Sequence, residues 1–269
     1  MGGQVSILRW DGRDFCHRSD AVAIEEPLEI RVNAESLAVT MRTPGHDFEL
    51  AAGLLFAEGL ISCKEDLLVV KRDANPENPD RENTVLTAVR PWTDDNARTS
   101  ASRTLTATSS CGICGKKDIE STRCLAPPIS DDEFRIHVNT VYSLNERMKA
   151  AQMVFAETGG LHAAALFNNS GELLSLREDI GRHNAVDKLI GAEVLGGRIP
   201  LPNRIMMISG RASYEILQKA AVARLPMVCA VSAPSSLAVR IAADLNITLI
   251  GFLRGETMNV YSAPNRLIK

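Results

Sequence analysis

The feature that most constrains the fold is an alternation of apolar and amphipathic segments that starts at residue 204. The apolar segments are RIMMISG, PMVCAVSA and NITLIGFLRG, and they are separated by RASYEILQKAAVARL and PSSLAVRIAADL. The apolar segments have the length of strands and few polar positions, as expected for strands buried on both faces. Strands that are joined through helices pair in parallel, so we predict an α/β layer in this half of the chain.

The segments just before this alternation extend the same half. Apolar residues recur at helical spacing from Val141 to Phe155, and Gly159 and Gly160 follow as a stop. The segment LHAAALFNNSGELLSLRED predicts a hairpin that turns at Asn-Asn-Ser-Gly, and GRHNAVDKLIGAEVL predicts another helix.

The first half predicts a smaller α+β unit. AVAIEEPLEIRVN and ESLAVTMR alternate as antiparallel strands do, and TPGHDFELAAGLLFAEGL predicts a helix that ends at Gly59. In that helix Phe48, Ala51, Ala52 and Leu55 share one face. Residues 73–83 are polar and predict a loop, whereas VLTAV and TLTAT predict short strands.

Pro127 and Pro128 break regular structure, and we place a domain boundary beside them. We therefore expect three parts: a disordered or extended N-terminus over 1–19, an α+β domain over 20–130 that ends in a CGICGK loop, and an α/β domain over 131–269.

The composition argues against two classes of function. The chain has 269 residues and a net charge of -3, so no overall basic field indicates nucleic-acid binding. Charge or proline interrupts every long apolar stretch, and the first residues lack the pattern of a secretory signal, so we expect no membrane association. The six cysteines, of which three cluster, fit the reduced thiols of a cytoplasmic protein better than a disulfide framework.

Small and cationic residues follow the predicted strands of the α/β half. The carboxyl ends of parallel strands meet at one edge of a sheet, where helix N-termini offer free N–H groups to phosphate. We therefore predict a crevice for a phosphate-bearing ligand there, with helix capping as the alternative explanation for these residues. The residues at these junctions are Arg182, His183, Asn184, Ser209, Gly210, Arg211, Ser213, Ser232, Ser235, Ser236, Arg254 and Gly255.

The stretch SSCGICGKK places Cys111 and Cys114 three residues apart. A structural zinc site usually has four ligands, whereas Cys124 is the sole further thiol nearby. A thioredoxin-like switch requires the pair to open a helix, which Gly115 disfavours. A zinc deaminase requires a glutamate two residues after a histidine, whereas two alanines follow His162.

A fourth interpretation of the pair is a mobile thiol carrier. Gly112 and Gly115 let the backbone bend, and Lys116 and Lys117 favour the nucleophilic thiolate. These residues allow a carrier but do not select it over the zinc site or the redox switch.

The chain contains six motifs that are informative together: TPGHDFELAAGLLFAEGLI, SSCGICGKKDIE, REDIGRHNAVDKLIG, SGRASYEILQKAA, SAPSSLAV and GFLRGETMNVYS. With these motifs the chain resembles the FdhD family of sulfur carrier proteins required for formate dehydrogenase activity. The resemblance implies a cytoplasmic sulfurtransferase that accepts a persulfide sulfur from a cysteine desulfurase. It also implies delivery of that sulfur to the molybdenum or tungsten bis-pterin guanine dinucleotide cofactor of the formate dehydrogenase catalytic subunit.

The resemblance further implies roles for particular residues. Cys111 would carry the persulfide with Cys114 as its partner, and no resident metal is expected. The cofactor-binding segment of the family corresponds to Phe252, Leu253, Arg254, Gly255, Glu256 and Thr257. From their positions at the predicted crevice we add Arg182, His183, Ser209, Gly210, Arg211 and Ser213.

The resemblance also implies a homodimer and a cytidine-deaminase-like layered sheet with helices in the C-terminal half, without catalytic zinc. Two other functions remain open at this point. One is a chaperone that holds the cofactor, and the other is a small zinc-binding interaction protein that uses the cysteine pair structurally.

Overall fold

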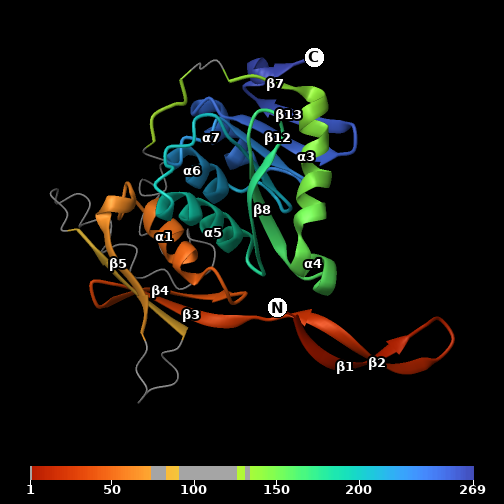
Figure 1. The fold of residues 1–269 in the computed structure, drawn as a ribbon. Helices are drawn as coiled ribbons and strands as arrows, with labels where there is room; N and C mark the ends of the chain where they lie inside the picture. Colours follow the sequence, from red (N-terminus) through yellow and green to blue (C-terminus); the bar gives the residue numbers. More distant parts are fainter. Residues whose placement is uncertain (1, 74–82, 91–125, 131–133) are drawn as a thin grey trace.

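The computed structural model describes residues 2–73, 83–90, 126–130 and 134–269. Its centre is a mixed six-stranded sheet in the order β13-β12-β11-β10-β8-β9 (Figure 1). The three strands β10, β11 and β12 run parallel, as the alternating pattern predicts, with α6 and α7 as their connections. These elements are β10 (Ile205–Ile208), α6 (Tyr214–Val222), β11 (Met227–Ala230), α7 (Ser236–Asp244) and β12 (Thr248–Arg254).

Antiparallel strands flank this parallel centre. The predicted hairpin forms from β8 (His162–Phe167) and β9 (Leu173–Asp179), and β8 pairs with β10, so the hairpin extends the same sheet. On the other side β13 (Thr257–Ser262) folds back along β12. The result is a mixed α/β layer, because a strand that returns through a tight turn must run antiparallel.

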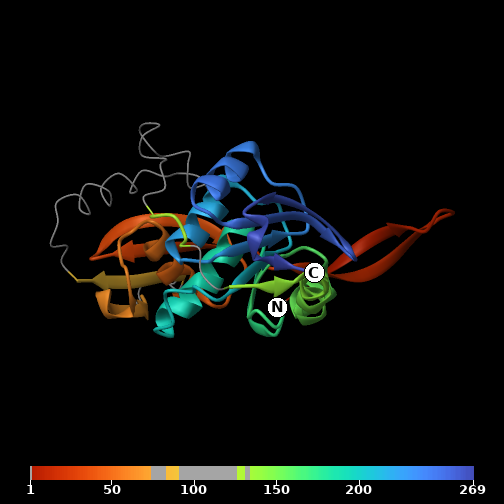
Figure 2. The same ribbon diagram turned by 90° about the horizontal axis from the view of Figure 1, so that it is seen from above.

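Helices cover both faces of the sheet (Figure 2). α3 (Val138–Ala151) packs on one face through side chains that include Leu144 and Met148. α5 (Arg182–Leu195), α6 and α7 pack on the other face. The strands are therefore buried on both faces, which accounts for their nearly continuous apolar sequence.

The predicted single helix from Val141 to Phe155 is wrong in its second part. The helix stops at Gln152, and a separate short helix, α4 (Met153–Thr158), follows. The Glu178 carboxylate accepts hydrogen bonds from the backbone N–H groups of Val154 and Phe155, which satisfies the first turn of the new helix. As a consequence Phe155 is 41% exposed instead of lying on the buried face.

The first half contributes α1 and a four-stranded sheet in the order β4-β3-β6-β5. Its antiparallel β3–β4 pair confirms the predicted pairing from Glu26 on, whereas residues 21–23 of the first predicted strand end the separate strand β2 (Phe15–Ala23). α1 ends just before Gly59 as expected. Ala51, Ala52 and Leu55 are buried, whereas Phe48 on the predicted face is 39% exposed. The elements are β3 (Glu26–Val32), β4 (Glu35–Arg42), α1 (Asp47–Ala57), the 3-10 turn Lys64–Asp66, β5 (Leu67–Arg72) and β6 (Thr84–Val89).

The two halves share one hydrophobic core. Side chains of α1 and the four-stranded sheet belong to the same cluster as those of α5, α6 and the central strands. The boundary near residue 130 remains a prediction. The predicted TLTAT strand and nearly all of the predicted loop over 73–83 lie outside the described residues.

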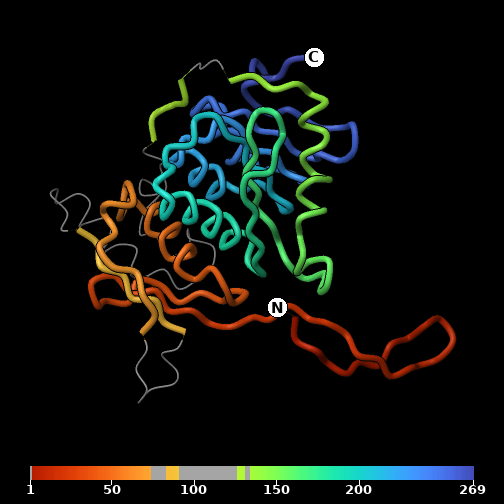
Figure 3. Tube along the Cα trace, in the orientation of Figure 1, coloured from red at the N-terminus to blue at the C-terminus, as the bar shows by residue number. Residues whose placement is uncertain are grey.

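The N-terminal segment forms an extended ribbon of β1 (Gly2–Trp10) and β2 (Phe15–Ala23), which projects from the body of the protein (Figure 3). At the other end of the chain, β14 (Leu267–Ile268) follows the 3-10 turn Pro264–Arg266 and pairs with β7 (Ile136–His137). Among the described residues, we find no helix with the length and apolar character needed to cross a membrane.

Candidate functional site

The two similar loops after β10 and β11 are hydrogen-bonded to each other at the carboxyl edge of the sheet. The N–H of Ala212 donates to Ala233 O at 3.2 Å, and the N–H of Ser235 donates to Ala212 O at 2.9 Å. Pro234 completes this pairing as an isolated bridge to Ala212. The two loops therefore hold each other in place.

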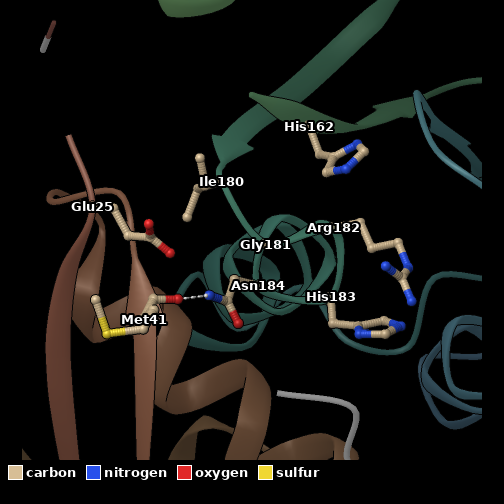
Figure 4. A pocket seen from close by; sticks show the side chains of 8 residues that line it. All are labelled: Glu25, Met41, His162, Ile180, Gly181, Arg182, His183 and Asn184. Atoms are coloured by element: carbon tan, nitrogen blue, oxygen red, sulfur yellow. Dashed lines mark hydrogen bonds between the residues drawn. The ribbon is translucent and has the colours of Figure 1, made fainter. Parts of the chain in front are cut away.

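A pocket of about 280 Å³ opens beside these loops, where α5 begins (Figure 4). Its walls come from both halves of the chain, because the segment before β3 and the end of β4 face the start of β8 and the start of α5. The residues that line it are Glu25, Met41, His162, Ile180, Gly181, Arg182, His183 and Asn184.

Arg182 and His162 form one side of the pocket, and Gly210 lies against both residues. Burial lowers the pKa of His162 below its ordinary value, and the charges of Arg182 and Arg211 lower it further. His162 is therefore mostly neutral at pH 7, and the positive charge comes from the two arginines. The Nε of Arg182 is buried and has no hydrogen-bond partner in the described structure, so it is available to a ligand.

A buried ionic network holds Asn184 and Met41 in place in the wall of the pocket. Asp179 at the end of β9 accepts from Lys188 Nζ at 2.6 Å and from the N–H of Thr43 at 3.2 Å. Asn184 Nδ2 donates to Met41 O at 2.8 Å and also to Asp179 at 3.1 Å. The carboxylate of Asp179 thereby joins β4, β9 and α5 at the pocket.

A second buried network lies behind His183. The His183 Nε2 is 3.1 Å from Ser213 Oγ and 3.6 Å from Glu215 Oε2. Glu215 in turn is 3.1 Å from Lys219 Nζ, which also lies 2.6 Å from Asp187. Buried charges require such partners, so this cluster holds the start of α5 against the start of α6.

Comparison of this sequence with known proteins identifies its family. A sequence model described as the FdhD/NarQ family matches residues 23–268. The chain belongs to the FdhD/NarQ family. Proteins named sulfur carrier protein FdhD are similar to it over most of their length. The one from Streptomyces avermitilis is 47% identical over 93% of this chain and 90% of its own.

A more distant relative agrees with this membership. The sulfur carrier protein FdhD of Saccharolobus solfataricus is 41% identical over 99% of this chain and 100% of its own. A crystal structure from Desulfotalea psychrophila, described as that of a formate dehydrogenase accessory protein, has a TM-score of 0.79 with 24% identity and covers 99% of each chain. This last likeness shows that the fold is shared.

The FdhD/NarQ fold brings some of the predicted site residues together. Arg182 and His183 line the pocket. Gly210 lies against His162 and Arg182, and the charge of Arg211 acts on His162. Ser209 has a structural role, because its Oγ accepts from the N–H of Ala163 at 2.9 Å.

The segment from Phe252 to Thr257 lies at the same edge of the sheet but does not line this pocket. It turns from β12 into β13, and the N–H of Phe252 donates to Ser232 O at 3.2 Å. Arg254 lies over the Phe252 ring at 5.9 Å and donates to Val231 O. β12 and β8 are three strand spacings apart, which is about 14 Å.

Five pocket residues are not among the predicted site residues: Glu25, Met41, His162, Ile180 and Gly181. Glu25 and Met41 lie in the first half of the chain, more than a hundred positions before the residues that they face. In the sequence, His162 stands out only as a histidine that lacks the glutamate of a zinc deaminase, and the pairing of β8 with β10 brings it to Gly210 and Arg182.

Cys111 and Cys114 lie outside the described residues, so their geometry remains a prediction. Of the described thiols, Cys229 is fully buried in β11, and burial raises its pKa to about 12. A hydrogen bond to Glu65 raises the pKa of Cys63. A raised pKa removes the thiolate at neutral pH, so neither thiol suits sulfur transfer. Within the described residues, no cluster of three His, Cys, Asp or Glu side chains could hold a metal ion.

Proposed function

We propose that the chain is a sulfur carrier that serves formate dehydrogenase. The observation that supports this most is the similarity to proteins named sulfur carrier protein FdhD, which extends over nine tenths or more of both chains. A similarity of this extent includes the whole pocket and the cysteine segment of this sequence, so the same chemistry is the simplest expectation.

In the proposed reaction, the thiolate of Cys111 attacks the outer sulfur of a persulfide on a cysteine desulfurase. A new S–S bond forms on Cys111, the S–S bond of the donor breaks, and the desulfurase cysteine leaves as a thiolate. Cys114 can then attack the Cys111 sulfur: the persulfide S–S bond breaks, the carried sulfur leaves as hydrosulfide to the acceptor, and a Cys111–Cys114 disulfide forms, which a thiol reductant must reopen before the next cycle. Glycines beside both cysteines give the segment the freedom to reach two partners.

The proposed acceptor is the molybdenum or tungsten bis-pterin guanine dinucleotide cofactor, which binds as cargo before it enters formate dehydrogenase. The cationic side of the pocket, with Arg182 and the nearby Arg211, suits its phosphates. A volume of about 280 Å³ lies just below the usual range for ligand pockets, which begins at about 300 Å³, so the pocket suits only one nucleotide portion of the ligand. The segment from Phe252 to Thr257, about 14 Å away, would contact another portion.

The remaining partner assignments belong to the same proposal. A cysteine desulfurase supplies the sulfur, the formate dehydrogenase catalytic subunit receives the cofactor, and the chain works as a homodimer. The mixed sheet would be of the cytidine-deaminase type, adapted to hold a nucleotide without catalytic zinc.

Mass spectrometry tests the proposed carrier directly. The intact protein is incubated with a cysteine desulfurase and cysteine, and it should gain about 32 Da that reduction removes. Cys111→Ala should abolish the gain, whereas the matched control Cys16→Ala should keep it. A Cys111→Ala chain that still gains the mass, and still supports formate dehydrogenase in cells, would refute the role of Cys111.

The two alternative functions predict different results. A chaperone that merely holds the cofactor would tolerate Cys111→Ala in cells but lose function with Arg211→Ala. A zinc-binding interaction protein would carry about one zinc per chain in metal analysis, bound through thiols.

A further inference from the structure

Among the described residues that line the pocket, Glu25 is the one acid, and it takes no part in the contacts that build the pocket walls. Its carboxylate makes no ion pair or hydrogen bond with the described part of the chain, whereas the carboxylate of its neighbour Glu26 lies 3.1 Å from Arg42 Nη1. Glu25 is also exposed to solvent. A carboxylate that faces a pocket without a protein partner is available to a ligand.

Backbone contacts fix the position of Glu25 opposite the start of α5. Glu26 pairs with Arg42 where β3 begins and β4 ends, so Glu25 lies beside the residues that follow β4. There Thr43 Oγ1 accepts a hydrogen bond from the N–H of Ile180 at 3.1 Å. The segment that carries Glu25 is thereby held against the segment that leads into α5.

The pocket has two chemically different ends (Figure 4). Glu25 lies at one end together with the side chains of Met41 and Ile180, and Arg182 lies at the other end. The buried Nε of Arg182 and the nearby charge of Arg211 make the second end suitable for phosphate. Because the charge of Glu25 would repel phosphate, the first end suits the uncharged part of a nucleotide, which is its base.

We propose that Glu25 selects guanine by accepting hydrogen bonds from N1–H and from the 2-amino group of the base. This inference rests on the proposed function, because it takes the guanine nucleotide portion of the cofactor as the occupant of the pocket. Guanine presents these two donors side by side, and an ionised carboxylate accepts two parallel N–H bonds with its two oxygens. Met41 and Ile180 offer apolar contact to the ring.

Other purine bases do not match the two acceptors of Glu25. Adenine places a ring nitrogen with a lone pair beside its amino group, so this nitrogen would face the negative carboxylate. Hypoxanthine keeps N1–H but lacks the 2-amino group. A polar group that loses its partner in a binding site costs affinity, so we expect the wild-type chain to prefer GDP over ADP and over IDP by about tenfold or more.

Isothermal titration of the full chain with GDP, IDP, ADP and XDP tests the proposal. Glu25→Gln should weaken binding of GDP about tenfold and remove the preference over IDP and ADP. It should bind XDP more tightly than wild type does, because the glutamine amide can donate to the carbonyl that replaces the 2-amino group. A loss of folding cannot produce a gain in affinity. Glu35→Gln, on an exposed position of β4, is the matched control and should keep the wild-type order of affinities.

Arg211→Ala separates the phosphate end of the pocket from the base end. It should weaken binding of all these nucleotides by a similar factor, because they carry the same phosphates. A Glu25→Gln chain that keeps the wild-type ratio of GDP to ADP affinity, and gains no affinity for XDP, would overturn the role of Glu25 while the nucleotide pocket stands. A wild-type chain that binds none of these nucleotides would overturn the nucleotide pocket of the proposed function and the role of Glu25 with it.

Discussion

The backbone of Gly53 in α1 lies directly against the carbonyl group of Asp187 in α5. A methyl group at Gly53 would overlap this carbonyl, and the reciprocal contact occurs at Gly191, where it would overlap the carbonyl of Glu49. Only glycine permits two helices to approach so closely. This contact packs α1, in the first half of the chain, against α5, whose first residues line the pocket.

Gly53→Ala should lower the free energy of unfolding by about 1–3 kcal/mol, because the new methyl forces the two helices apart. Chemical denaturation monitored by circular dichroism measures the change. Gly3→Ala is the control, since its added methyl would meet neighbours only at 3.7 Å or more. Equal stability of the Gly53 and Gly3 variants would show that α1 and α5 are not so tightly packed.

Lys219→Met should destabilise the protein by about 3–5 kcal/mol, because it leaves Asp187 and Glu215 as buried charges without their cation. Burial alone would lower the pKa of Lys219, but these two carboxylates raise it, so the ammonium stays charged. The exposed Lys149 of α3 offers the same substitution as a control, with an expected change within about 0.5 kcal/mol. A small effect of Lys219→Met would mean that water reaches the cluster.

Glu49→Gln should reduce stability at neutral pH and have no effect near pH 2. Burial by itself would raise the pKa of Glu49, but hydrogen bonds from Arg177 and His46 lower it to about 2 from 4.5. A lowered pKa in the folded state stabilises above pH 4.5, and this contribution disappears as the pH falls from 4.5 to 2. Because solvent screens this half-buried site, we expect about 1 kcal/mol.

Thermal melts of wild type and Glu49→Gln across this pH range measure the difference, with Glu35→Gln on an exposed position of β4 as the control. A difference between wild type and the Glu49 variant that stays constant down to pH 2 would exclude a titrating carboxylate as its cause.

Arg211→Ala should weaken binding of GDP by about ten- to a hundredfold, since hydrogen bonds to a charged group contribute roughly 1.5–3 kcal/mol. Isothermal titration of the full chain with GDP measures the affinity. Arg204→Ala is a close control, because Arg204 precedes β10 at the opposite edge of the sheet from Arg211. Equal affinities of the two variants for GDP would show that the phosphates do not bind at the carboxyl edge of the sheet.

Local patterns predicted the elements that depend on near neighbours along the chain. The β10–β11–β12 alternation, the β8–β9 hairpin and the stop of α1 at Gly59 all follow from spacing and turn residues, and the structure confirms them. The break at Gln152 does not follow from local spacing, because the carboxylate that caps α4 after the break comes from Glu178, a residue on a distant strand.

The sequence by itself determined the α/β layer, the carboxyl edge with its arginines and the family of the protein, because each is encoded in residues close together in the chain. Tertiary structure decided the pocket. Glu25, Met41 and His162 meet there only because the contact of Gly53 with α5 and the ionic bonds of Asp179 bring distant segments together. Contacts between positions more than a hundred residues apart depend on the packing of whole elements, and no short pattern records them.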